Sequence, residues 1–308
     1  TAAAKAAPGV HGVFTGEDYR ADGMGVVPCM GDYNHRNGGL MYIPDRPALA
    51  VGKVMHIGYP VVLVVAETEN QARDACELID VDYEVLPAVT SCRDAFEDGA
   101  PQLYEDCPNN ESYLYSAGDK AGTDKAFEEA DHVVSHHLVI NRVTANAMEN
   151  RGVIGEYSPN DGRYTLRCGF QRPWLFRKSL ADQSFKVPES KIRLVTDDIG
   201  GSYGMKSSIY NENVLVLWAS KVTERPVKWT SDRTEAFQSD TQGRDNVTTG
   251  ELALDRDGKF LGMRVKTIGN IGAYVTQAAG GPLTINLGTL AGVYTTPAIH
   301  VDVTAVFS

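Results

Sequence analysis

Two apolar runs near the start of the chain indicate buried strands. Residues 60–66 (PVVLVVA) are continuously apolar and rich in β-branched side chains, as expected of a buried strand. Residues 10–16 (VHGVFTG) predict a short strand that leads into a turn. Between them, residues 17–47 are dense in glycine, aspartate, asparagine and proline. That composition predicts a turn-rich insertion rather than a further regular element.

A helical pattern follows the second run. In residues 68–79 (TENQARDACELI), apolar side chains recur at the i, i+3, i+4 and i+7 positions of one helix face. Thr68 and Gln71 have the spacing of a capping box, which marks the beginning of a helix. Residues 81–89 (VDYEVLPAV) then alternate between apolar and polar side chains. The region therefore predicts a strand, a helix and a second strand.

A polar stretch at 98–124 has little periodicity and many turn-forming residues, which is typical of a linker between domains. Beyond it, the pattern predicts a short helix at 124–130 and a long strand at 132–140. Residues 153–157 and 163–169 are apolar runs separated by the turn sequence SPNDG. We expect these two runs to form a hairpin.

The remaining elements include a glycine-rich loop between a predicted strand and a predicted helix. Pro173 suits the first turn of a helix, and a strand is predicted at 191–196. A glycine-rich loop at 197–208 (DDIGGSYGMKSS) connects this strand to a helix at 209–221, whose middle is almost entirely apolar and therefore buried. Long strands are predicted after it, at 246–255, 260–275 and 298–308. Helices and strands are thus interspersed, which predicts a mixed α+β fold.

Composition excludes several classes of protein. The 308 residues include 40 Asp and Glu against 29 Lys and Arg, a formal net charge of −11. No basic face for nucleic acid or an anionic membrane is expected from this balance. No apolar run approaches the roughly 18–20 residues of a membrane helix. The five cysteines are scattered, without a CxxC pair, so we expect reduced thiols and a cytoplasmic location.

The glycine-rich loop invites three interpretations. It lies between a strand and a helix, where backbone N–H groups can bind an anion, or it is only a tight connection that needs glycine. The run Gly200–Gly204 also matches GxSxG, the nucleophile elbow of α/β-hydrolases, with Ser202 as nucleophile and His300 as the one downstream histidine. The acid of that triad would be Asp232, Asp240 or Asp245. Against it, Ser202 lies well beyond the strand end and His300 lies within a predicted strand.

Several motifs in fixed order resemble the molybdenum-binding large subunit of the xanthine dehydrogenase and aldehyde oxidase family. They include APGVHGVFTGED (7–18), TANAMENRGVIGEYSPNDGRYTLRCGFQ (144–171), VPESKIRLVTDDIGGSYGMK (187–206) and RPVKWTSDRTEAF (225–237). The branch most similar in appearance is that of aerobic carbon monoxide dehydrogenases. The resemblance implies an α/β hammerhead domain at 1–105, without its opening strands, and the first half of a molybdopterin-binding domain at 106–308. The chain is accordingly expected to be a fragment.

Few functional positions are implied by the resemblance. The family has a glutamine beside the oxo ligand of molybdenum, and Gln171 in GFQRPW occupies that place. The family's Gly-Gly-Gly-Phe-Gly loop lies against the metal end of the cofactor and corresponds to Gly200, Gly201, Ser202, Tyr203 and Gly204. A serine thus replaces one glycine, and a tyrosine keeps the aromatic ring. No residue of this chain is expected to bind metal directly, and the family's catalytic glutamate would lie beyond residue 308.

The resemblance further implies a molybdenum–molybdopterin cofactor, in the cytosine dinucleotide form. The complete enzyme would oxidise an aldehyde, an N-heteroaromatic compound or CO with oxygen from water. Electrons would pass to an iron–sulfur subunit and then to an FAD subunit. Purine-oxidising members have a glutamate where Ser207 stands and an arginine where Ile285 stands, so a purine is not expected. Two other classes remain: the GxSxG hydrolase, and a structural module without catalysis.

Overall fold

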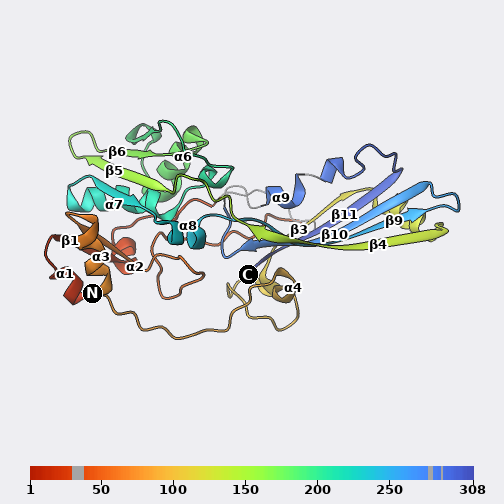
Figure 1. The fold of residues 1–308 in the computed structure, drawn as a ribbon, viewed down its shortest axis with the longest axis horizontal. Helices are drawn as coiled ribbons and strands as arrows, with labels where there is room; N and C mark the ends of the chain where they lie inside the picture. Colours follow the sequence, from red (N-terminus) through yellow and green to blue (C-terminus); the bar gives the residue numbers. More distant parts are fainter. Residues whose placement is uncertain (30–37, 277–279, 286) are drawn as a thin grey trace. The chain divides into compact units, whose positions relative to one another are not determined.

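The computed structural model describes residues 1–29, 38–276, 280–285 and 287–308 (Figure 1). Helices and several sheets are combined, as the predicted α+β class requires. Residues 30–37 of the expected insertion lie outside the described residues. The chain forms two compact units, each built from three separate segments. Unit 1 comprises 1–29, 45–86 and 144–241, and unit 2 comprises 30–44, 87–143 and 242–308. The expected domains at 1–105 and 106–308 stay a prediction.

The first strands and helix of unit 1 follow the sequence pattern. Strands β1 (Val10–Thr15) and β2 (Val62–Ala66) pair antiparallel. Helix α3 (Glu69–Glu77) begins at the Thr68–Gln71 capping box, which is present in both directions. Ala75 of α3 packs with Val13 and Ala4 in a small core. Two short helices complete this part, α1 (Ala2–Lys5) and α2 (Gly16–Ala21).

The predicted strand at 81–89 is wrong. These residues have no regular secondary structure, and the side chain of Val85 is 91% exposed. The sheet of this region contains only β1 and β2 within the described residues. An alternating segment becomes a strand only where a neighbour pairs with its backbone, and here none does.

A four-stranded sheet and one buried helix form the centre of the remaining part of unit 1. The strand order is β7–β6–β5–β8, with β6 and β7 parallel and the other pairs antiparallel. The bounds are β5 (Gly152–Ser158), β6 (Arg163–Cys168), β7 (Ile192–Val195) and β8 (Val227–Thr230). Strands β5 and β6 form the predicted hairpin. Helix α7 (Asn211–Thr223) packs on this sheet, and its ten residues from Asn211 to Ser220 are all buried.

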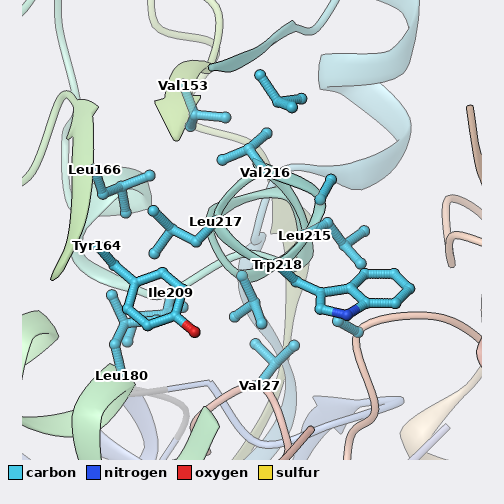
Figure 2. Close-up of a cluster of buried hydrophobic side chains, with 14 of the residues drawn as sticks. Val27, Val153, Tyr164, Leu166, Leu180, Ile209, Leu215, Val216, Leu217 and Trp218 are labelled. Atoms are coloured by element: carbon cyan, nitrogen blue, oxygen red, sulfur yellow. The ribbon is translucent and has the colours of Figure 1, made fainter. Parts of the chain in front are cut away.

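The core of unit 1 surrounds α7. Figure 2 shows Val216 and Leu217 directed toward Val153 and Leu166 of the sheet, while Trp218 points the other way. The Trp218 indole nitrogen donates a hydrogen bond to Asp22 (2.8 Å), and Tyr19 meets its ring edge-on. A helix that is apolar on all sides needs partners on all sides, which explains why distant segments converge on α7.

Shorter elements of unit 1 lie before and after this helix. Helix α6 (Pro173–Ser179) begins with proline as predicted and continues into a π-helical turn, η2 (Leu180–Phe185). Helix α8 (Arg233–Ser239) is capped by the Asp232 side chain, which accepts from the Glu235 N–H. Two single turns are η3 (Glu189–Lys191) and η4 (Met205–Ser207).

Unit 2 is a five-stranded sheet in the order β3–β11–β10–β9–β4. The bounds are β3 (Glu111–Gly118), β4 (His132–Val143), β9 (Gly243–Leu254), β10 (Phe260–Gly272) and β11 (Ala298–Phe307). Strands β10 and β11 are parallel, and the other pairs are antiparallel. Around it are α4 (Cys92–Ala95), η1 (Pro108–Asn110), α5 (Lys120–Glu128), α9 (Gly281–Thr284) and η5 (Leu287–Thr289).

The prediction of a linker at 98–124 is wrong, because this stretch contains regular structure. It contains β3, which pairs with β11 over Glu111–Gly118, and the first half of α5. The helix therefore begins earlier than the predicted 124–130. Because β3 finds its partner more than 180 residues later in the chain, nothing local in the sequence marks it as a strand. No helix within the described residues is long and apolar enough to cross a membrane.

Candidate functional site

The glycine-rich loop connects the end of β7 at Val195 to the start of α7 at Asn211. Three of its residues have left-handed backbone: Gly201 (φ +105°), Tyr203 (φ +53°) and Gly204 (φ +95°). For tyrosine this conformation is uncommon and must be held by its surroundings. The Tyr203 side chain is 81% exposed, and a Cβ on Gly204 would meet no atom within 4 Å. The tip of the loop is therefore open to another molecule.

Ser202 has a structural role in this loop. It is buried, and its Oγ accepts a hydrogen bond from the Lys206 backbone N–H (3.0 Å), while its carbonyl accepts from the Met205 N–H (2.9 Å). These bonds close the turn around Tyr203 and Gly204. The serine thus satisfies backbone groups as a capping residue does.

The hydrolase interpretation is not supported. An elbow needs its serine directly between strand and helix, whereas Ser202 lies seven residues after β7 and nine before α7. His300 lies inside β11 in the other unit, with Asp302 at 3.8 Å. The three candidate acids have other partners: Asp232 caps α8, Asp240 pairs with Arg151, and Asp245 pairs with Arg142.

Glu149 holds the first half of the loop. Its Oε2 accepts a hydrogen bond from the Gly200 N–H, and its own N–H donates to the Gly200 carbonyl, each at 3.0 Å. A Cβ on Gly200 would lie 2.6 Å from the Cβ of Glu149, so only glycine allows this approach. The same carboxylate also accepts from Nζ of Lys206. This bond lowers the pKa of Glu149 and keeps it ionised.

The structure brings Gln171 next to this loop. The Gln171 backbone N–H donates to the carbonyl of Lys206 (3.3 Å), and its side chain is exposed. Two residues earlier, a Cβ on Gly169 would lie 3.4 Å from both Ile199 and Lys206. The end of β6 and the glycine-rich loop therefore run in contact. Gln171, Tyr203 and Gly204, expected from sequence, are each exposed, and Gln171 contacts the loop through its backbone at Lys206.

A cavity of about 380 Å³ lies beside the loop within unit 1. Its walls come from residues 148–153, the end of β6, the loop and the start of α7, with further residues from α6, β8 and α8. They combine charged, polar and apolar side chains: Glu149, Arg151, Cys168, Phe176, Lys206, Tyr210, Glu212, Asn213 and Arg233. Burial raises the pKa of Cys168 well above its usual value, so this thiol stays neutral and is not a nucleophile at neutral pH.

Buried charge in the cavity wall centres on Arg151. Its guanidinium pairs with Glu212 and, at 2.7 Å, with Asp240, and lies 4.0 Å over the ring of Tyr210. Burial raises the pKa of both carboxyls, and Arg151 opposes that shift. The Tyr210 hydroxyl donates to the Met205 carbonyl (3.0 Å). The network therefore reaches the end of the glycine-rich loop.

Sequence reasoning missed Glu149, Lys206, Arg151 and Glu212. Glu149 and Lys206 are 57 residues apart in sequence, and only the folded structure shows that their side chains are in contact. Glu212 carried a usable signal, because an acid at the start of an otherwise apolar helix must be paired once that helix is buried. Within the described residues, no group of three or more His, Cys, Asp or Glu could hold a metal ion.

Family models match nearly the whole chain. Residues 103–308 match the molybdopterin cofactor-binding domain. Residues 1–87 match the a/b hammerhead domain of aldehyde oxidase and xanthine dehydrogenase.

Relatives and solved structures agree with these models. The chain is 35% identical to the 6-hydroxypseudooxynicotine dehydrogenase complex subunit gamma of Paenarthrobacter nicotinovorans, over 99% of this chain and 38% of the relative. It is 34% identical to the carbon monoxide dehydrogenase large chain of Hydrogenophaga pseudoflava, with the same coverage. Quinoline 2-oxidoreductase from Pseudomonas putida 86 matches with a TM-score of 0.87 at 30% identity, over 99% of this chain and 38% of that one. The chain thus spans about 38% of the length of these relatives.

Proposed function

Because the chain belongs to the molybdenum-binding large subunits of the xanthine dehydrogenase and aldehyde oxidase family, we propose that its glycine-rich loop and Gln171 face the metal end of a molybdopterin cofactor. The observation that carries this proposal is the hydrogen bond between the Gln171 N–H and the Lys206 carbonyl. It joins the Gln171 segment to the glycine-rich loop, 35 positions later in the sequence.

The residues present fit such a group. Gly204 is left-handed and has no atom within 4 Å of its would-be Cβ, so a planar ligand can approach the backbone closely. The amide of Gln171 is neutral and carries two N–H donors, which suit a strongly polarised oxygen without adding charge. The ring of Tyr203 is exposed at the same tip.

The cofactor and the residues of this chain would have separate roles. The bound cofactor would supply two-electron oxidation of the substrate with oxygen derived from water. Gln171 would orient the metal end through its amide, and the loop would exclude water on the side of Tyr203 and Gly204. Ser202, in the place of a family glycine, would serve only the shape of the loop, since its hydroxyl is turned to the Lys206 N–H.

The wider assignment follows the relatives. We propose a complete enzyme that oxidises an aldehyde, an N-heteroaromatic compound or CO, with the cytosine dinucleotide form of the cofactor. An iron–sulfur subunit and an FAD subunit would carry the electrons away. Relatives named as a dehydrogenase complex subunit and as large chains support an assembly of several subunits. The scattered cysteines favour the cytoplasm as its compartment.

The test is a Gln171→Ala variant of the complete complex that contains this chain. Turnover of an aldehyde, an N-heteroaromatic compound and CO is followed with an artificial electron acceptor. We expect kcat on the accepted substrate to fall by about 10- to 100-fold, the usual effect of removing such an outer contact. Gln238→Ala, at another exposed glutamine of unit 1, serves as the matched control. Wild-type kcat in the Gln171→Ala complex would refute the assignment.

A further inference from the structure

Lys206 is the point at which the parts of the proposed site are joined. Its backbone N–H donates to Ser202 Oγ, its carbonyl accepts from the Gln171 N–H, and its Nζ donates to Glu149. One residue therefore fixes the turn of the loop, the neighbouring glutamine segment and an acidic partner from outside the loop.

Glu149 closes the arrangement from the other side. Its backbone and carboxylate both bind Gly200, which precedes the turn. Glu149 precedes β5, whereas Gly200 and Lys206 follow β7. The carboxylate thus bridges Gly200 and Lys206, on either side of the tip, and Tyr203 and Gly204 at the tip stay exposed.

The burial of the two charges is unequal. The Lys206 side chain is 5% exposed, and that of Glu149 is 48% exposed. A buried ammonium is costly unless it is paired, whereas a half-exposed carboxylate can be solvated by water. Loss of the Glu149 charge alone should therefore disturb the loop more than loss of the Lys206 charge. Loss of both removes the unpaired charge and also removes the bridge.

We propose that Glu149 and Lys206 are a positioning pair, which sets the distance between Gln171 and the Tyr203–Gly204 tip. This inference rests on the proposed function, since that distance matters only if both parts face one cofactor. Neither side chain needs to touch the cofactor. Each acts through backbone groups: Glu149 through Gly200, and Lys206 through Ser202 and Gln171.

The test uses the complete complex with Glu149→Gln, Lys206→Met and the double variant. Backbone hydrogen exchange of the peptides that cover 200–206 and 169–172 is measured in complex from cells starved of molybdate. Exchange reports loop opening and does not require turnover, so it can be measured without the metal. Lys178→Met, which removes an exposed lysine paired with Asp182 at 2.8 Å, is the matched control.

We expect Glu149→Gln to exchange about tenfold faster at both peptides and to lower kcat by about 10²-fold with little change in KM. The double variant should regain the Tm of the wild type, because no buried charge is left unpaired. It should nevertheless keep the fast exchange and the low kcat. A purely structural pair would instead recover all three, and that result would overturn the proposal.

Glu149→Asp gives an independent reading that does not depend on the double variant. It keeps the charge but shortens the reach, so the Tm should stay near that of the wild type while exchange at 200–206 quickens. Wild-type exchange in this variant would also contradict the proposal. Wild-type kcat for Gln171→Ala, in contrast, would refute the proposed function while leaving the exchange result intact.

Discussion

Arg151 is the residue on which the buried charge of unit 1 depends. One guanidinium faces the carboxylates of Glu212 and Asp240 and also donates to the Ser239 hydroxyl. Its side chain is 5% exposed. In such a site the two carboxylates are tolerated only because the cation is present. Arg151 also contacts Tyr210, whose hydroxyl supports the loop through Met205.

An Arg151→Met variant should therefore lose about 3–5 kcal/mol of unfolding free energy, the cost of leaving buried charge unpaired. Denaturant unfolding at neutral pH measures it. The matched control is Arg163→Met, because Arg163 forms an exposed ion pair with Asp161 at 3.4 Å. Exposed ion pairs contribute about 0–1 kcal/mol. Equal losses in the two variants would show that Arg151 does not hold the network.

The same variant has a defined pH dependence. Burial raises the pKa of Glu212 and Asp240 in the folded state, and removing Arg151 raises both further. A carboxyl whose pKa is higher in the folded than in the unfolded state binds its proton more tightly in the folded protein. Its contribution to the unfolding free energy is therefore favourable at low pH and is lost as the pH rises through the folded pKa. The deficit of Arg151→Met should therefore shrink as pH falls from about 8 toward the raised pKa values.

At the scale of elements, the close contact between β5 and α7 shapes unit 1. A Cβ on Gly155 of β5 would lie 2.6 Å from the backbone of Val216 in α7. Helix and strand thus meet backbone to backbone, with no room for a side chain. On the same strand, the atom nearest to a Cβ on Gly152 would be in the Thr230 side chain, at 3.8 Å.

Gly155→Ala should therefore lower the unfolding free energy by about 1–3 kcal/mol, as overpacking in a core does. Gly152→Ala, in the same strand, should change it far less, because its Cβ would be at an ordinary contact distance. Thermal unfolding of both variants gives the comparison. The packing described here would be wrong if the two substitutions lowered the Tm equally.

Local patterns predicted the elements whose causes are local. The capping box of α3, the apolar middle of α7 and the alternation of β11 all lie within the segments that they define. Residues 81–89 and β3 failed because pairing with a distant strand decides the outcome. The site divides in the same way. Gln171 and the loop are found through motifs, whereas Glu149 and Lys206 meet only in three dimensions.

At the scale of the whole molecule, each unit is assembled from three separated segments. The chain matches a cofactor-binding domain over 103–308 yet spans about 38% of its relatives. In the proposed enzyme, Gln171, Tyr203 and Gly204 would form part of the wall of a larger site. The proposed activity is therefore tested on the complete complex.

The most direct test is the molybdenum and pterin content of the purified complete complex, with and without a Gly204→Val substitution. Valine at φ +95° is strained and projects into the open space at the tip of the loop. We predict equimolar molybdenum and pterin in the wild type, and at least about a tenfold loss of both in the variant. A folded wild-type complex without molybdenum and pterin, or a variant that retains both in full, would contradict the account.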